Sequence, residues 1–130
     1  QIGMLAGMKS EWVAGFVSES MAGFFGIRIP VLLEDFHIRE GSGGNGKWRA
    51  GNGTRCTIRA LKELNFGIQS GHRRVPPFGL EGGEPGQVGH NEVRRKGGLV
   101  QALKGCDEAV LMPGDAFIIS TPTGGGFGKA

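Results

Sequence analysis

Two adjacent arginines are the side chains best suited to binding chemistry in this sequence. Arg73 and Arg74 follow His72 and stand just before a proline turn at residues 75–79. A guanidinium group presents a planar fork of donors that matches a carboxylate or a phosphate. We therefore predict that His72, Arg73 and Arg74 bind an anionic group of a substrate.

The same arginine pair also allows a purely structural interpretation. Neighbouring side chains of an extended segment point to opposite faces, so only one arginine could enter a given pocket unless the backbone turns there. The alternative is a surface pair, in which one arginine bonds nearby carbonyl groups. The sequence leaves both interpretations open.

A glycine-rich loop at residues 41–46 fits two nucleotide-binding patterns, G-x-G-x-x-G and the front of a phosphate loop. Both patterns need a helix directly afterwards, because the helix N-terminus holds the phosphate. Trp48 stands where a phosphate loop needs Ser or Thr, and residues 49–53 cannot begin a sound helix. We therefore favour a loop packed closely against another backbone, with a backbone donor surface as the functional alternative. That surface would use Gly41, Ser42, Gly43, Gly44 and Gly46.

Residues for metal or nucleophilic chemistry are sparse and scattered. His37, His72 and His90 show no paired spacing typical of zinc sites, so we predict no local metal site. Cys56 and Cys106 are too few and too distant for a zinc framework, and nothing requires them to form a disulfide. No serine lies in a G-x-S-x-G elbow. The sequence identifies no catalytic residue.

From residue 30 onward, alternating apolar and polar residues predict short β-strands. We expect the runs at 54–61 and 64–68 to form one hairpin, and those at 92–95 and 99–103 a second. Such short strands predict a mainly β fold, either a sandwich or a partly open barrel of antiparallel strands with Gly-rich loops. The predicted strands span 31–39, 54–61, 64–68, 92–95, 99–103, 110–112 and 116–121.

A strong turn signal at Pro113-Gly114-Asp115 separates the last two predicted strands. We expect the carboxylate of Asp115 to bond nearby backbone amides and so stabilise this turn. Pro122 and the glycines at 124–126 then end the last strand, because proline cannot donate to a sheet.

Residues 1–29 differ from the rest of the chain. Apolar side chains recur there at spacings of three and four, which predicts an amphipathic helix. Gly7, Gly15 and Gly23 oppose a helix, because each costs about 1 kcal/mol relative to Ala. We therefore expect an N-terminal helical or irregular segment at 1–29 and a β-rich domain at 30–130.

Composition limits the partners. The chain has 130 residues, 26 of them glycine, and a formal charge of +3. Its basic residues are interspersed with acidic ones and there is no tyrosine, so we do not predict nucleic-acid binding. No apolar run approaches the ~18 residues of a membrane span. No secretory signal is visible, so we expect a cytoplasmic protein and no membrane partner.

Five segments, in order along the chain, carry distinctive motifs: Arg39–Gly46, Arg49–Gly53, Arg73–Gly86, Leu111–Asp115 and Thr121–Gly128. They resemble R-x-G-S-G-G-x-G, R-G-G-x-G, R-R-x-x-P-x-G-L-x-G-G-x-P-G, L-x-P-G-D and T-P-G-G-G-G-Y-G of the hydantoinase B / 5-oxoprolinase family, near the C-terminus of its members. One departure is Ser70-Gly71-His72, which stands where the family usually has S-E-R. A carboxylate expected at that point is therefore missing.

The resemblance implies a fragment of an ATP-dependent hydrolase that opens a cyclic amide, either a hydantoin or 5-oxoproline, and that is inactive alone. It implies an A-type partner subunit or domain that binds ATP and Mg, so that this fragment binds neither. The upstream part of the B-type chain is a further partner, and a homo-oligomer is possible. The alternatives are a structural or assembly module for the A-type partner, or part of a related ATP-dependent carboxylase.

Overall fold

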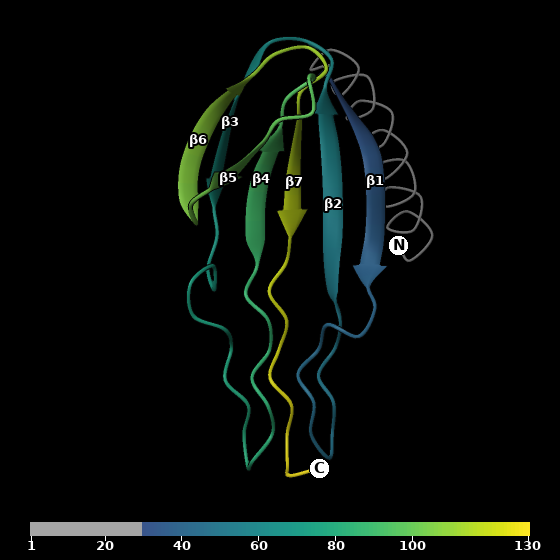
Figure 1. The fold of residues 1–130 in the computed structure, drawn as a ribbon, viewed down its shortest axis with the longest axis vertical. Coiled ribbons are helices and arrows are strands. Elements are labelled where there is room, and N and C mark those ends of the chain that lie inside the picture. Colours follow the sequence, from purple (N-terminus) through teal and green to yellow (C-terminus); the bar gives the residue numbers. More distant parts are fainter. Residues whose placement is uncertain (1–29) are drawn as a thin grey trace, which may run out of the picture.

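The computed structural model describes residues 30–130, and these fold into β-strands joined by long loops (Figure 1). The strands are β1 (Val31–Arg39), β2 (Gly53–Ala60), β3 (Leu64–Gln69), β4 (His90–Arg94), β5 (Val100–Leu103), β6 (Cys106–Leu111) and β7 (Ala116–Ser120). The expectation of a mainly β fold with short antiparallel strands is confirmed. The helical segment predicted at 1–29 lies outside the described residues. In the described part of the chain, no helix is long and apolar enough to cross a bilayer.

The strands form two antiparallel sheets. The larger sheet has the order β1-β2-β7-β4-β5, and β3 pairs with β6 in the smaller one. The predicted hairpin of β4 and β5 is confirmed. The predicted hairpin of β2 and β3 is wrong, because residues 61–63 carry the chain from one sheet to the other.

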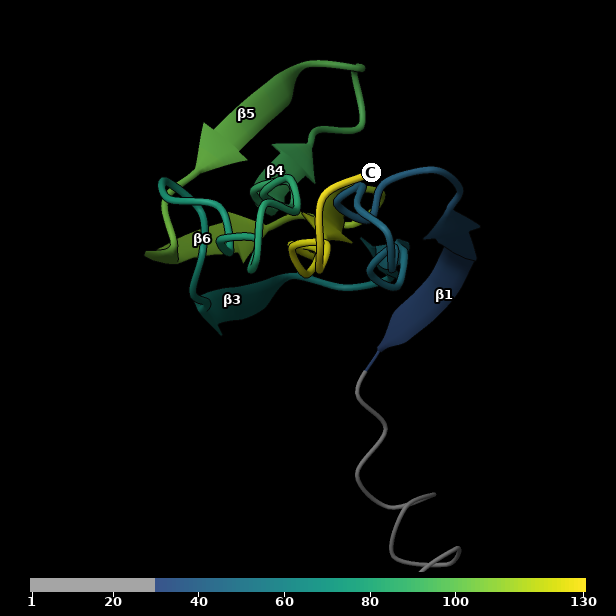
Figure 2. The ribbon, with the colours of Figure 1, turned by 90° about the horizontal axis from the view of Figure 1, so that it is seen from below.

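A small apolar core lies between the two sheets. Val93 of β4 and Leu111 of β6 are fully buried. The ring of Phe66 in β3 stacks on that of Phe117 in β7, with centroids 4.2 Å apart. Full burial of one aliphatic side chain contributes about 1.5–3 kcal/mol, so this core holds the two layers together. Figure 2 shows that the smaller sheet lies on the side of the molecule away from β1.

Three glycine-rich segments leave the same end of the larger sheet and run side by side (Figure 1). We call them the glycine bundle, comprising residues 41–52, 77–87 and 121–128. Backbone hydrogen bonds join them: Gly44 N donates to Gly124 O at 3.0 Å, and Gly126 N donates to Glu84 O at 2.8 Å. A Cβ atom added at Gly126 would collide with the carbonyl of Asn45. The main chains therefore pack directly on each other, with no layer of side chains between them.

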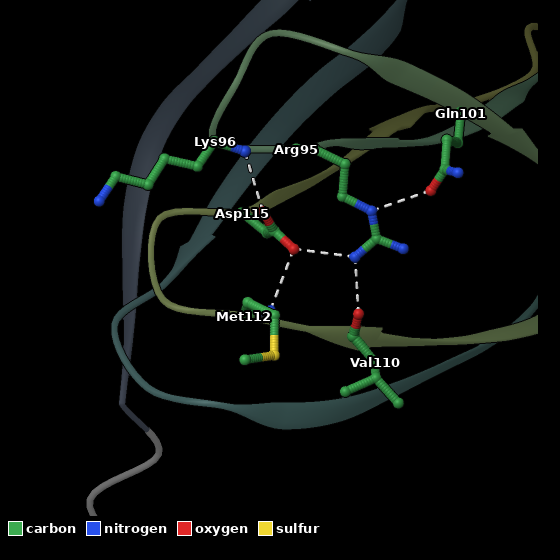
Figure 3. Close-up of polar contacts among 6 residues, drawn as sticks. All are labelled: Arg95, Lys96, Gln101, Val110, Met112 and Asp115. Atoms are coloured by element: carbon green, nitrogen blue, oxygen red, sulfur yellow. Dashed lines mark hydrogen bonds and ion pairs between the residues drawn. The ribbon is translucent and has the colours of Figure 1, made fainter.

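Two turns at the opposite end of the strands share the carboxylate of Asp115 (Figure 3). Its oxygens accept from Met112 N at 3.0 Å and from Lys96 N at 2.9 Å. Arg95 Nη1 donates to the same carboxylate at 2.8 Å and to Val110 O at 2.7 Å. The expectation that Asp115 bonds backbone amides of its own turn is confirmed, and the bonds to Arg95 and Lys96 extend it to the β4–β5 connection.

Candidate functional site

An open cleft of about 780 Å³ lies where β3 ends and where β5 turns into β6. The segments 70–75 and 103–106 line it. Three of the lining residues, Arg73, Arg74 and Lys104, carry a positive charge, and no Asp or Glu is among them. The cleft therefore presents a cationic wall to solvent.

A backbone turn places both predicted arginines in this cleft. His72 has a φ of 51°, which lies in the left-handed region, and its carbonyl accepts from Gly89 N at 2.9 Å. Segment 72–75 is therefore not extended, and the two arginine side chains need not point to opposite faces. The structure thus brings His72, Arg73 and Arg74 together, whereas their role in binding stays a prediction.

Arg73 is fixed at two of its donors. Its Nε donates to Asn91 Oδ1 at 3.0 Å, and its Nη1 donates to Gly71 O at 2.7 Å. A guanidinium has five N–H donors, so three have no partner within residues 30–130. Burial lowers the pKa of Arg73 from its usual value, but arginine stays charged at every physiological pH. The site therefore combines a held cation with donors that a ligand could use.

Asn91 lies behind Arg73 and is only 3% exposed. Its Nδ2 donates to Ser70 Oγ at 2.8 Å and to Lys104 O at 3.1 Å. One amide thus ties β4 to both segments that line the cleft. Sequence reasoning missed this residue. A signal that could have identified it is its position two residues before Val93, which places both side chains on the inward face of β4.

Lys104 and Cys106 are the other exposed residues of chemical interest on the cleft wall. Sequence reasoning missed Lys104, because nothing in its local pattern links it to Arg73. The neighbouring Asp107 accepts from the backbone amides of Lys104 and Glu108, each at 2.9 Å, and these bonds lower its pKa. Asp107 therefore stays ionised at neutral pH, next to the cleft but outside its lining.

The predicted glycine loop belongs to the glycine bundle and lies at no helix N-terminus. The amide of Ser42 donates to Arg39 O, that of Gly43 to Asn52 Oδ1, and that of Gly44 to Gly124 O. These three amides are already used within the protein. The predicted role of this loop as a hydrogen-bond donor to an anion therefore remains a prediction for its other amides only. These include the amides of Gly41 and Gly46.

The described residues do not fit a nucleotide–magnesium site. Within residues 30–130 no group of three or more His, Cys, Asp or Glu side chains could hold a metal ion. The segment after the glycine loop leads into β2 instead of a helix, so it offers no helix dipole to a phosphate.

Comparison with known proteins gives consistent matches. The model of the family described as hydantoinase B/oxoprolinase matches residues 22–130. The chain is 44% identical over 103 residues to a 5-oxoprolinase of Saccharomyces cerevisiae and 39% identical over 102 residues to 5-oxoprolinase 1 of Arabidopsis thaliana. It is 26% identical over 102 residues to a Pseudomonas protein that is named as the B-type subunit of a putative D-/L-hydantoinase.

These alignments cover most of this chain but little of each relative. They include 78% of the chain and 8% of each of the two oxoprolinases, and 77% of the chain and 17% of the hydantoinase relative. The chain therefore spans less than a tenth of the length of these oxoprolinases. No solved structure matches it.

Proposed function

Because the chain belongs to the hydantoinase B/oxoprolinase family, we propose that it builds one part of an enzyme that hydrolyses a cyclic amide such as 5-oxoproline. The fragment is inactive alone and works with the upstream part of a B-type chain and with an A-type subunit or domain. That A-type partner supplies ATP and Mg. The name of the hydantoinase relative as a B-type subunit supports the existence of an A-type partner. The poor fit of residues 30–130 to a nucleotide–magnesium site supports the assignment of ATP and Mg to that partner.

The cationic cleft is the observation that carries this proposal. Arg73, Arg74 and Lys104 line it without an acidic neighbour on its wall. 5-Oxoproline bears a carboxylate next to its ring, whereas an unsubstituted hydantoin has none. Guanidinium groups bind carboxylates through paired, charge-assisted hydrogen bonds. The cleft therefore favours a cyclic amide that carries a carboxylate.

The proposed role of these side chains is to hold and orient the substrate. Arg73, whose Nε and Nη1 are fixed, offers its remaining donors to the carboxylate, and Arg74 and Lys104 add charge. Holding the carboxylate fixes the direction in which the ring amide points, and such positioning raises the rate of a following step. The general base and the attack on the amide belong to residues outside this cleft.

Substitution of the exposed cations tests the proposal. Arg74→Ala and Lys104→Ala are compared with Lys62→Ala, a control at an exposed residue of the β2–β3 connection, in the full-length B-type chain with its A-type partner. A hydrogen bond to a charged group contributes about 1.5–3 kcal/mol, so we expect the KM for 5-oxoproline to rise at least about tenfold. Arg74 and Lys104 add only charge, which attracts the carboxylate equally in the bound substrate and in the transition state, so kcat should change little. If KM were unchanged in both cleft variants, the cleft would not be part of the substrate-binding site.

A deletion of residues 30–130 separates the main proposal from its alternative. Loss of ATP-dependent ring opening, in a complex that still assembles, would support a place at the reaction site. Retained activity would contradict it. The rate with and without added bicarbonate then distinguishes hydrolysis from the chemistry of a related ATP-dependent carboxylase.

The alternative is a structural module that forms part of the interface with the A-type partner. The glycine bundle favours it, because three amides of its first loop are used internally and Trp48 and Phe127 stand exposed side by side across a backbone bridge. Under this alternative, Trp48→Ala would weaken assembly of the complex. The KM of the assembled complex would stay the same.

A further inference from the structure

The orientation of the Asn91 amide is fixed by its three partners. Arg73 Nε can only donate and Lys104 O can only accept, so Oδ1 must face the arginine and Nδ2 must face the carbonyl. A carboxylate in this place would set an oxygen against the Lys104 carbonyl. An apolar side chain would leave Arg73 Nε without its acceptor. Only a side-chain amide satisfies both sides.

Asn91 also stands on a well-held element. It lies in β4, which pairs with β7 on one side and with β5 on the other, opposite Ile119 and Leu103. An interior strand of a sheet moves less than a loop, so it positions side chains more accurately. The loop that carries Arg73 is thereby tied to the sheet through one side chain.

Gly89, just before β4, leaves the space that the arginine occupies. A Cβ atom there would stand 2.6 Å from Arg73 Cζ and even closer to Nη1. It would also lie 2.8 Å from Ser120 O. The guanidinium therefore occupies the space beside Gly89 that a larger residue would fill, with Asn91 bonded to its Nε.

We propose that Asn91 and Gly89 position Arg73 over the cleft, so that recognition of the substrate carboxylate depends on two residues that do not line the cleft. This inference rests on the proposed function. Asn91 holds the Nε of the guanidinium, and Gly89 leaves room for the group to lie there. The N–H donors of Arg73 that Asn91 and Gly71 do not use are then presented to the carboxylate. Neither residue is catalytic, because both act through Arg73.

A double-mutant cycle tests this inference in the full-length B-type chain with its A-type partner. KM and kcat for 5-oxoproline are measured for Arg73→Ala, Asn91→Ala and the double variant. We expect each single change to raise KM about tenfold, and the double variant to be no worse than Arg73→Ala alone, because residues that act as one unit are not additive. A merely structural effect of Asn91 would persist after Arg73 has been removed.

Two results would overturn the inference in different ways. If Asn91→Ala raises KM by the same factor with and without Arg73, Asn91 acts independently, and the proposed site survives without it. If Arg73→Ala leaves KM unchanged while Arg74→Ala raises it, Arg73 does not bind the substrate and the positioning role falls. If none of these variants changes KM, the proposed site falls as well.

Gly89→Ala provides a second variant in which the bonds from Asn91 to Ser70 and Lys104 remain possible. We expect it to raise KM because the added methyl displaces the Arg73 guanidinium. Gly97→Ala, in the β4–β5 turn, is the matched control, because a Cβ there meets nothing within 4 Å. Equal KM values for Gly89→Ala and Gly97→Ala would overturn the role of Gly89. If Asn91→Ala also had the KM of the unsubstituted protein, the whole inference would be overturned.

Discussion

At the residue scale, Asp115 shows two opposing influences on one carboxyl group. Burial works to raise the pKa of Asp115, since the side chain is almost inaccessible to water. The hydrogen bond from Arg95 and those from the amides of Met112 and Lys96 lower it and prevail. The pKa of Asp115 therefore lies below its usual value, and the group is ionised at neutral pH.

This lowered pKa gives Asp115 a pH-dependent share of the stability. A carboxyl whose pKa falls on folding stabilises the fold above its unfolded pKa, which is about 3.9, and this contribution is lost as pH falls through the folded pKa. We expect Asp115→Ala to lower the free energy of unfolding by about 3 kcal/mol at pH 7, because Arg95 and two amides lose a buried partner. Urea unfolding at pH 7 and at low pH measures this.

The control for this experiment is Glu63→Ala, which removes an exposed carboxylate between β2 and β3. It should change the unfolding free energy by less than about 0.5 kcal/mol. The gap between wild type and Asp115→Ala should shrink as pH falls below about 4. A gap that stays constant down to low pH would contradict the assigned pKa direction.

Side-chain type identified only part of the candidate site in advance. Arg73 and Arg74 were found because two guanidiniums beside a proline turn suggest an anion site. Asn91 and Lys104 come from β4 and from the β5–β6 turn, so no local spacing links them to the arginines. Their proximity is a consequence of strand pairing, which the sequence of any one segment does not specify.

At the element scale, strand positions were more predictable than strand partners. The bounds of β1 match the predicted strand, and those of β2 differ by one residue at each end, because alternation of apolar and polar residues is a local property. The partner of β3 is β6, some forty residues further along, and it pairs Leu64 with Leu111 and Gln69 with Cys106. A short connection resembles a hairpin locally even where it changes sheets.

The glycine bundle makes a sharp prediction about backbone packing. A Cβ at Gly126 would collide with the Asn45 carbonyl, so the two main chains must separate. We expect Gly126→Ala to lower the free energy of unfolding by about 3 kcal/mol or more, the upper end for overpacking. Gly51→Ala in the same bundle is the control, because a Cβ there meets nothing within 4 Å. Similar urea midpoints for the two variants would refute the described close packing.

At the scale of the whole molecule, more large apolar side chains are exposed than buried among residues 30–130. Its buried apolar core consists of Ala60, Val93, Leu111, Ala116 and Ile118, whereas four apolar residues of β1 alone are exposed. The outer edge of β1 pairs with no other strand among residues 30–130. A long exposed apolar edge favours pairing with another chain segment. We therefore expect β1 to be covered in the complete protein.

Hydrogen exchange tests this expectation. Amides of β1 should exchange at least about tenfold more slowly in the full-length B-type chain than in a protein of residues 30–130, because a covered edge opens less often. Amides of β7, an interior strand, should be protected in both proteins if the shorter one folds. Equal protection of β1 in the two proteins, with β7 protected in both, would mean that nothing covers this edge.

The construction of the glycine bundle also has a calorimetric consequence. Its segments are held by peptide groups, so its unfolding exposes mainly polar surface. Polar surface lowers the heat capacity of unfolding, whereas apolar surface raises it. The heat-capacity increment per residue of this unit should therefore fall below the ~12–15 cal/mol/K that is usual for globular proteins. Its stability should vary less steeply with temperature than that of a domain built around a large apolar core.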